Sequence, residues 1–207
     1  MALGNRERLV RLGEWVRDTC CEGMLLKTPE KSADGKEVKS IRPRCFVGNF
    51  YPAFTRGELY VVTPSILVMF TGGYGSGETM KYMDNRNSIR RPREIAQTLD
   101  VQLVHAVFEP ITRYEKTTVD GTPWDECIDE GSLVLQDWME KTMAHLIGVD
   151  SIPNTDLFVQ PESVRWQPLT EDGAVADRGQ YRLGVVYATF ETETRKDDNA
   201  AIRALLD

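Results

Sequence analysis

Residues 65–77 read SILVMFTGGYGSG, an apolar run that passes directly into a segment with four glycines. The run ILVMF at residues 66–70 is shorter than an ordinary helix, follows Pro64, and consists of large or β-branched apolar side chains typical of a strand. No polar residue interrupts it, so we expect both faces of this strand to be covered. The sequence therefore predicts a central sheet strand followed by a loop that contains Gly72, Gly73, Gly75 and Gly77.

The glycine segment partly matches a phosphate-binding loop. Gly72, Gly77 and Thr79 follow a strand and have the spacing of G-x-x-x-x-G-K-[ST]. Glu78, however, stands where that motif has a lysine, and its carboxylate would repel a phosphate. Residues 80–88 also lack the apolar stripe of the helix whose N-terminus holds the anion. These departures favour a plain connection, with an enzyme acting on a phosphorylated ligand as the alternative.

Length and composition indicate an ordinary globular protein. A chain of 207 residues suffices for one domain, and 41% hydrophobic with 28% charged residues is usual for a soluble protein. The net charge of −7 argues against nucleic-acid binding over the whole surface. The first residues do not resemble a secretory leader, and no window approaches the ~18 apolar residues of a membrane span. We therefore expect synthesis in a cytoplasm and no membrane partner.

The residues that most often carry catalysis or bind metals do not form a recognised set. The cysteines lack C-x-x-C spacing and a nearby histidine, so we expect reduced structural thiols at Cys20, Cys21, Cys45 and Cys127. His105 lies in an alternating apolar segment and is expected to be structural, and His145 has no H-E-x-x-H partner. The acidic residues 125–130 lack the spacing of a calcium loop. We expect no enzymatic activity, no cofactor and no metal site.

Periodicity predicts two helices and several strands in the rest of the chain. The helices are expected over residues 5–21 and 131–148, the second with Ser132 as its N-cap. Alternation predicts further strands over residues 44–51, 59–62, 97–108, 157–168 and 180–194. The last two are joined by a short link, so we expect them to be antiparallel. Residues 28–43 are polar and basic and are expected to form a projecting hairpin or a loop.

These elements predict an α+β fold in a single domain over residues 1–207. Its centre would be a mostly antiparallel sheet flanked by two main helices. Long polar insertions are expected near residues 28–43 and 111–131, and a charged C-terminal tail over residues 191–207.

Basic residues gather between the glycine segment and the next strand. Asp84 and Glu94 dilute this cluster, whose members are Lys81, Arg86, Arg90, Arg91 and Arg93. In an acidic protein such a cluster could contact phosphates or an acidic partner. The alternative is a solvated loop without a binding role. Within residues 81–93, Tyr82 is the only aromatic residue that could stack on a base, so specific binding of single-stranded nucleic acid is weakly supported.

In the order and pattern of these elements the chain resembles the tail terminator family of long-tailed bacteriophages. The resemblance covers roughly two thirds of the chain and depends on no diagnostic motif. It is carried by residues 66–70 with Gly72 and Gly73, by residues 97–108 (QTLDVQLVHAVF), by the helix at residues 133–147, and by residues 181–192 (YRLGVVYATFET). The two polar insertions make this chain larger than the compact members of the family.

The resemblance implies a structural virion protein without catalysis. Such a protein forms a hexameric ring at the head-proximal end of the tail, ends polymerisation of the tube, and joins the tail to the neck or head. The implied partners are further copies of the chain, the tail tube protein, a neck or connector protein, and double-stranded DNA that passes without sequence specificity. The implied location is the tail or neck of the virion, after assembly in the cytoplasm of a bacterial host.

Three alternatives stay open at this stage. A different head-tail connector or a baseplate component would show much the same pattern. The phosphate-ligand enzyme would use residues 72–79, and an adaptor would bind one partner through its charged C-terminal segment. Under the terminator interpretation, residues 81–93 would face the lumen of the ring or an adjacent subunit.

Overall fold

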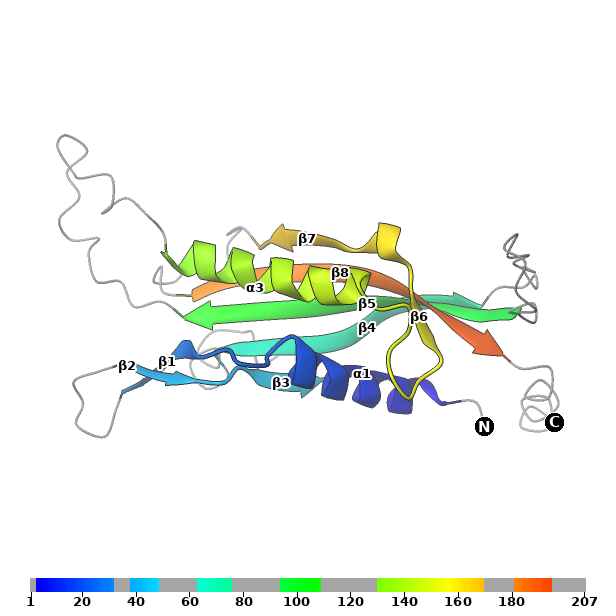
Figure 1. Ribbon diagram of the computed structural model, residues 1–207, viewed down its shortest axis with the longest axis horizontal. Coiled ribbons are helices and arrows are strands. Elements are labelled where there is room, and N and C mark those ends of the chain that lie inside the picture. The colour runs from blue at the N-terminus through cyan, green and yellow to red at the C-terminus, as the bar shows by residue number, and fades with distance from the viewer. Residues whose placement is uncertain are drawn as a thin grey trace.

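The computed structural model describes residues 3–31, 38–48, 63–75, 94–108, 130–169 and 181–194. These residues form the predicted α+β fold, with two α-helices and a mostly antiparallel sheet (Figure 1). The helices are α1 (Asn5–Thr19) and α3 (Glu130–Ile147), with a short 3-10 helix η4 (Pro161–Ser163). The strands are β1 (Leu26–Lys31), β2 (Val38–Ile41), β3 (Arg44–Val47), β4 (Ser65–Gly75), β5 (Glu94–Phe108), β6 (Leu157–Val159), β7 (Arg165–Pro168) and β8 (Tyr181–Thr194).

Six of these strands form the main sheet, in the order β3-β4-β5-β8-β6, with β7 also paired to β8. Within the described part of the chain every pairing is antiparallel except that of β3 with β4. The two longest pairings join β4 to β5 and β5 to β8, and both continue past the ends of the helices (Figure 1). The sheet is therefore built around three long central strands.

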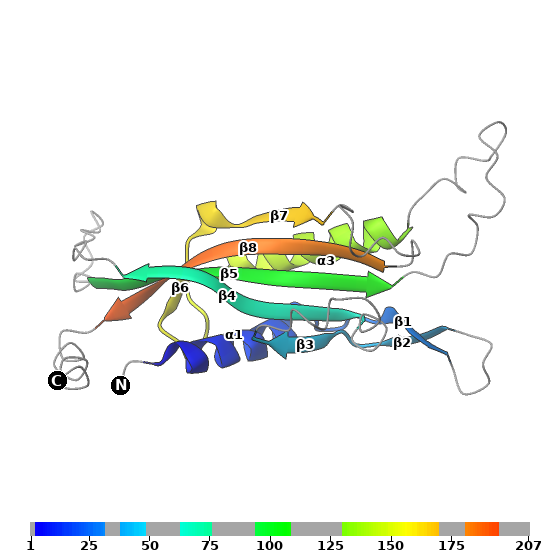
Figure 2. The same cartoon turned by 180° about the vertical axis from the view of Figure 1, so that it is seen from behind.

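Both helices pack on the same face of this sheet (Figures 1 and 2). The main core lies between them and the strands, and its fully buried members include Leu12, Val16, Ile66, Val68, Leu103, Trp138, Leu146, Val186 and Phe190. Residues 66–68 of β4 are completely buried, and β4 lies between β3 and β5. The prediction of a buried interior strand at this position is confirmed.

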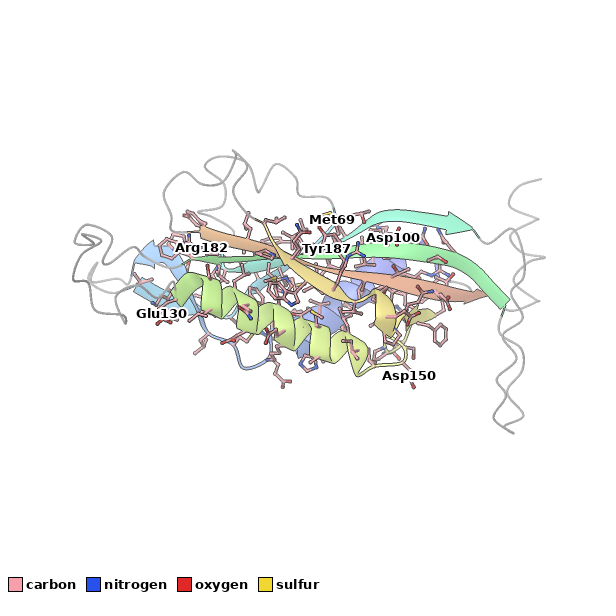
Figure 3. The ribbon with its side chains drawn as sticks, turned by 90° about the horizontal axis from the view of Figure 1, so that it is seen from above. Met69, Asp100, Glu130, Asp150, Arg182 and Tyr187 are labelled. Carbon is pink, nitrogen blue, oxygen red and sulfur yellow. The ribbon has the colours of Figure 1, made fainter. Side chains whose placement is uncertain are left out.

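The opposite face of the sheet carries a smaller apolar cluster. Its buried members are Leu67, Val104 and Val185, and partly buried Met69 and Tyr187 pack against them. Met69 and Tyr187 lie on the side of the sheet away from α3 (Figure 3). The alternation predicted for the last strand is therefore present in β8, where Val185 and Tyr187 occupy this face and Val186, Ala188 and Phe190 face the helices.

Two glycines allow the helices to approach the strands closely. A methyl group on Gly184 of β8 would overlap Met139 Sδ of α3 and lie 2.8 Å from its Cε atom. A methyl group on Gly13 of α1 would overlap the side chain of Val47 in β3. A methyl group at Gly184 would require the end of the Met139 side chain to move, and one at Gly13 would require the side chain of Val47 to move.

The glycine segment differs from the prediction of a loop. β4 does not end at Phe70 but continues through Gly72, Gly73 and Gly75, which pair with β5 after a bulge. Pairing continues because residues 97–100 of β5 lie opposite residues 72–75. At Gly73 the absence of a Cβ allows Leu99 Cδ2 and the Thr98 carbonyl oxygen to come within 2.9 and 3.0 Å of the Cβ position. The predicted loop is therefore wrong for these three glycines, while Gly77 lies outside the described residues.

Other predicted boundaries need smaller corrections. The helix expected over residues 131–148 already begins at Glu130, so Ser132 lies inside its first turn and is not its N-cap. The strand expected over residues 157–168 is split into β6 and β7 by η4, where Pro161 interrupts the strand pattern. β6 and β7 both pair antiparallel with β8, as predicted for this pair of segments.

The predicted hairpin over residues 28–43 is present as β1 and β2, which form a separate two-stranded sheet. Of the strand expected over residues 44–51, residues 44–47 form β3, and residues 49–51 lie outside the described residues. The strand expected over residues 59–62, the insertion up to residue 129 and the tail beyond residue 194 lie outside the described residues.

Candidate interaction surfaces

The basic cluster predicted to contact DNA or a neighbouring subunit lies outside the described residues. This applies to Lys81, Arg86, Arg90, Arg91 and Arg93.

The phosphate-loop interpretation fails at Gly72, its first residue. Gly72 pairs with Asp100 in the β4–β5 ladder, and Asp100 Oδ2 lies 3.2 Å from the position of a Cβ on Gly72. A phosphate-binding loop requires backbone N–H groups that turn toward the anion, whereas this backbone runs along a strand beside a carboxylate. The backbone at Gly72 therefore lacks the geometry that the alternative phosphate-ligand enzyme would need.

His105 of β5 is part of a buried polar network. Its Nδ1 lies 2.9 Å from the Leu103 carbonyl oxygen, and its Nε2 lies 3.0 Å from Thr142 Oγ1 of α3. Because a carbonyl oxygen only accepts, the neutral ring donates from Nδ1 and accepts at Nε2. The edge of the ring also meets Trp138, with 4.8 Å between ring centroids, and Trp138 Nε1 donates to the Cys20 carbonyl oxygen at 3.2 Å. The network thus joins β5, α3 and the end of α1.

Burial keeps this histidine neutral. The apolar surroundings lower the pKa of His105 to about 3, and the hydrogen bond to the Leu103 carbonyl only partly opposes that shift. A fully buried, uncharged imidazole with both nitrogens engaged supports the fold. The prediction that His105 is a structural residue is confirmed.

The described cysteines are also structural. Cys20, Cys21 and Cys45 are free thiols, and burial raises the pKa of each to about 12. Cys45 Sγ donates to the Gly13 carbonyl oxygen at 3.3 Å. Thiols that stay protonated are poor nucleophiles and poor metal ligands. The prediction of reduced structural thiols is confirmed for these three residues, and Cys127 lies outside the described part.

A half-buried ion pair fixes α1 to the segment before β6. Arg8 Nη2 lies 2.6 Å from Asp156 Oδ2, and Arg8 Nε donates to Asp156 Oδ1 at 2.8 Å. The side chains are 8% and 21% exposed. A bidentate pair of this kind is directional, so it sets the position of α1 along the sheet.

Within the described ranges, no three histidine, cysteine, aspartate or glutamate side chains gather to hold a metal ion. Of the helices in that part of the chain, none combines the length and apolar character needed to cross a bilayer.

The first surface suited to a protein partner is the hairpin of β1 and β2. Together with the residues that lead into β3, residues 26–44 carry six lysines and arginines against three acids, Glu30, Asp34 and Glu37. The cations among the described residues are Lys27, Lys31, Lys39, Arg42 and Arg44. Residues 38–40 are all exposed, so both faces of β2 reach the surface there. Leu25, just before β1, is 72% exposed. We call residues 25–31 and 38–41 the basic hairpin.

The second such surface is the side of α3 that points away from the core. The residues that share it are Leu133, Gln136, Asp137, Glu140, Ala144 and Ile147, all exposed and spaced by three or four positions. Leu133 and Ile147 are each 48% exposed, which is unusual for residues opposite a helix's buried stripe. We call this set the α3 ridge. The periodicity of the sequence predicts this helix but does not identify the ridge, although Leu133 and Ile147 are apolar residues outside the buried stripe.

No protein-family model matches the chain, and a search of curated proteins finds no match. The functional assignment therefore depends on the resemblance in element order and on the surfaces of the fold.

Proposed function

We propose that this chain is a structural virion protein that forms a ring at the head-proximal end of a phage tail. There it ends polymerisation of the tail tube and joins the tail to the neck or head. Double-stranded DNA passes through the ring without sequence-specific contacts.

One observation carries this proposal, namely the order of elements around the sheet. A helix, a hairpin, a buried central strand, a long strand, a second helix and an antiparallel closing strand follow one another in the described residues. This is the order on which the resemblance to tail terminators depends, except that strand β4 continues where that order has a glycine loop. The placement of both helices on one face and the exposed apolar residues of α3 further support a protein that contacts neighbours.

The test is to polymerise the tail tube protein of the same phage, with and without the purified chain in excess. We expect tubes to stop growing, and negative-stain electron micrographs to show a ring at the head-proximal end of each tube. Tubes of unchanged length with bare ends would contradict the proposal. Binding at the distal end would instead assign the chain to the baseplate, and binding only to a connector ring would assign it elsewhere in the neck.

A second test concerns the predicted basic cluster. Under the proposal, Arg90→Glu with Arg91→Glu impairs joining of tails to heads or DNA passage without loss of the fold. A matched control reverses two exposed arginines of α1, Arg6 and Arg17, and so changes net charge equally. Normal infectious particles from the Arg90 and Arg91 variant would contradict a lumenal or interfacial role for this cluster.

A further inference from the structure

We propose that neighbouring copies in the ring are joined by residues 76–93 of one copy, docked on the α3 ridge of the next. We call residues 76–93 the basic segment, because they contain the basic cluster between β4 and β5. This inference rests on the proposed function and specifies which surfaces meet. The occupant of the α3 ridge is thus the basic segment of a second copy of this chain.

The α3 ridge combines exposed apolar and exposed acidic side chains. Leu133 and Ile147, near its two ends, are each 48% exposed, and exposed Asp137 and Glu140 lie between them. Glu140 accepts a hydrogen bond of 2.9 Å from the neutral amide of Gln136, and no cation among the described residues pairs with either carboxylate. The described part of the chain therefore leaves both negative charges without a counter-charge. Such a surface suits a partner that is cationic and partly apolar.

The basic segment has the opposite charge to α3. It carries two acids, Glu78 and Asp84, against five cations: Lys81, Arg86, Arg90, Arg91 and Arg93. The helix carries one lysine against three acids: Glu130, Asp137 and Glu140. That lysine, Lys141, donates to the Glu22 carbonyl oxygen at 2.9 Å. In a chain whose net charge is −7, a cationic segment is attracted to the acidic surface of another copy, and the attraction favours one orientation of docking.

The basic segment also supplies apolar side chains for the ends of the ridge. These are Met80, Tyr82, Met83 and Ile89. Contact between them and Leu133 or Ile147 would remove apolar surface from water on both copies. Apolar contacts that surround charged pairs exclude water and strengthen those pairs.

The arginines nearest β5 cannot reach the ridge of their own chain. Glu94, where β5 begins, lies past the ends of the helices (Figure 1). His105, eleven positions further along β5 and about 35 Å away, contacts Trp138 and Thr142, which flank Glu140 on α3. Arg90 and Arg91 precede Glu94 by four residues or fewer, so their backbone stays within about 14 Å of it. Their guanidinium groups therefore meet an acidic α3 ridge only on another copy.

Docking between two different surfaces has a consequence for symmetry. Gly75 and Glu94, the residues that precede and follow the basic segment, belong to the end of the sheet, whereas the ridge lies along the helical layer (Figures 1 and 3). The contact is therefore head-to-tail, and every open assembly keeps one free segment and one free ridge. Addition of copies continues until the assembly closes on itself, which is how such a contact forms a ring.

Charge reversal tests the contact. The segment variant carries Arg90→Glu and Arg91→Glu, and the ridge variant carries Asp137→Lys and Glu140→Lys. We expect each variant alone to self-associate at least about tenfold more weakly than the original chain, measured by light scattering across a concentration series. A chain with all four changes should regain association, because its charges are complementary again.

Mixing provides a sharper result. The reversed segment matches the reversed ridge, and the original segment matches the original ridge. An equimolar mixture of the two variants should therefore form assemblies in which they alternate, seen as a one-to-one ratio in native mass spectra. Failure of both the mixture and the four-fold variant to associate would overturn the inference, as would unchanged association of either variant alone.

Controls separate a specific contact from a general effect of charge or folding. Arg6→Glu with Arg17→Glu on α1 changes net charge as much as the segment variant and should leave self-association unchanged. Equal weakening by this pair would overturn the inference. Arg90→Gln with Arg91→Gln removes charge without reversing it and should weaken association less than the glutamate pair. All variants should keep the circular dichroism spectrum and melting temperature of the original chain.

A duplex DNA titration tests the competing role of the same arginines. The inference predicts that the segment variant loses self-association whether or not DNA is present. If that variant instead loses binding to a DNA duplex and keeps its self-association, the basic segment contacts DNA and the inference is wrong.

The two proposals fail in different assays. A purified chain that stays monomeric up to about 1 mM, the weak limit of specific affinity, would overturn the interface. If that chain still stops tube growth, the proposed function stands. Self-association through this interface without any effect on tubes would leave the interface and remove the terminator role.

Discussion

The two sides of α3 differ in what their residues contact. The inner side is fully buried at Trp138, Thr142 and Leu146; the Trp138 indole donates to the Cys20 carbonyl oxygen, and the Thr142 hydroxyl bonds to His105. The outer side exposes Leu133 and Ile147 beside acidic residues. The inner side is therefore tied to the stability of one copy, and the outer side is available to another molecule. Substitutions on the two sides should separate stability from assembly.

Trp138→Ala should have the largest effect on stability. It removes the largest fully buried side chain among the described residues and its hydrogen bond to the Cys20 carbonyl oxygen. We expect a loss of about 3–5 kcal/mol in the free energy of unfolding, measured by urea titration. A loss below about 1 kcal/mol would mean that α3 does not pack on the sheet through this residue.

Gly184→Ala should cost about 1–3 kcal/mol of unfolding free energy, because the added methyl overlaps Met139. Met139→Ala removes the overlapping atoms, so the double variant should lose less than the sum of the two single losses. Thermal unfolding of the three variants measures this coupling. Simple additivity would show that the helix does not approach β8 closely at this glycine.

His105 should make stability depend on pH. Its pKa is about 3 in the folded chain, against an ordinary value of 6.5, so between these values the unfolded chain binds more protons. This contribution is fully present above the unfolded pKa, and stability falls as the pH drops below it, by at most about 1.4 kcal/mol per pH unit. His105→Gln keeps hydrogen-bonding groups but does not titrate. Urea midpoints measured between about pH 7 and pH 5 should therefore fall less steeply for the variant than for the original chain. Parallel curves would contradict a buried neutral histidine.

Leu133→Ser with Ile147→Ser should have the smallest effect on stability. Both residues are about half exposed, so we expect a change within about 0.5 kcal/mol for each. Self-association should nevertheless weaken, because the apolar ends of the α3 ridge are lost. Val10, exposed on α1, offers a matched control, and Val10→Ser should change neither property. If Val10→Ser weakened self-association as much, the effect of the Leu133 and Ile147 substitutions would not be specific to the outer side of α3.

Most of the fold could be predicted from local patterns, but the glycine segment could not. A buried run, a long alternating strand and two amphipathic helices each produce a periodic signal within their own residues. Glycines at residues 72–75 favour a loop by local propensity, yet β5 supplies a partner at each position and extends β4. Tertiary pairing therefore overrides local propensity at these glycines.

The candidate surfaces were less predictable than the fold. The basic character of the hairpin is visible in the composition of residues 26–44, but exposure on both faces of β2 follows from its position beside the main sheet. The apolar ends of the α3 ridge appear in sequence only as extra hydrophobic residues on an amphipathic helix. Which side of the helix is buried depends on how the helix packs on the sheet.

The sequence by itself determined the class of fold, the interior strand, the structural nature of His105 and the absence of a lysine from the phosphate-like segment. These properties depend on residue type and on spacing along one segment. Tertiary structure alone decided that both helices share one face, that Gly184 admits Met139, and that Leu133 and Ile147 point outward. These properties depend on contacts between residues distant in the chain, and no local pattern specifies the partner in such a contact.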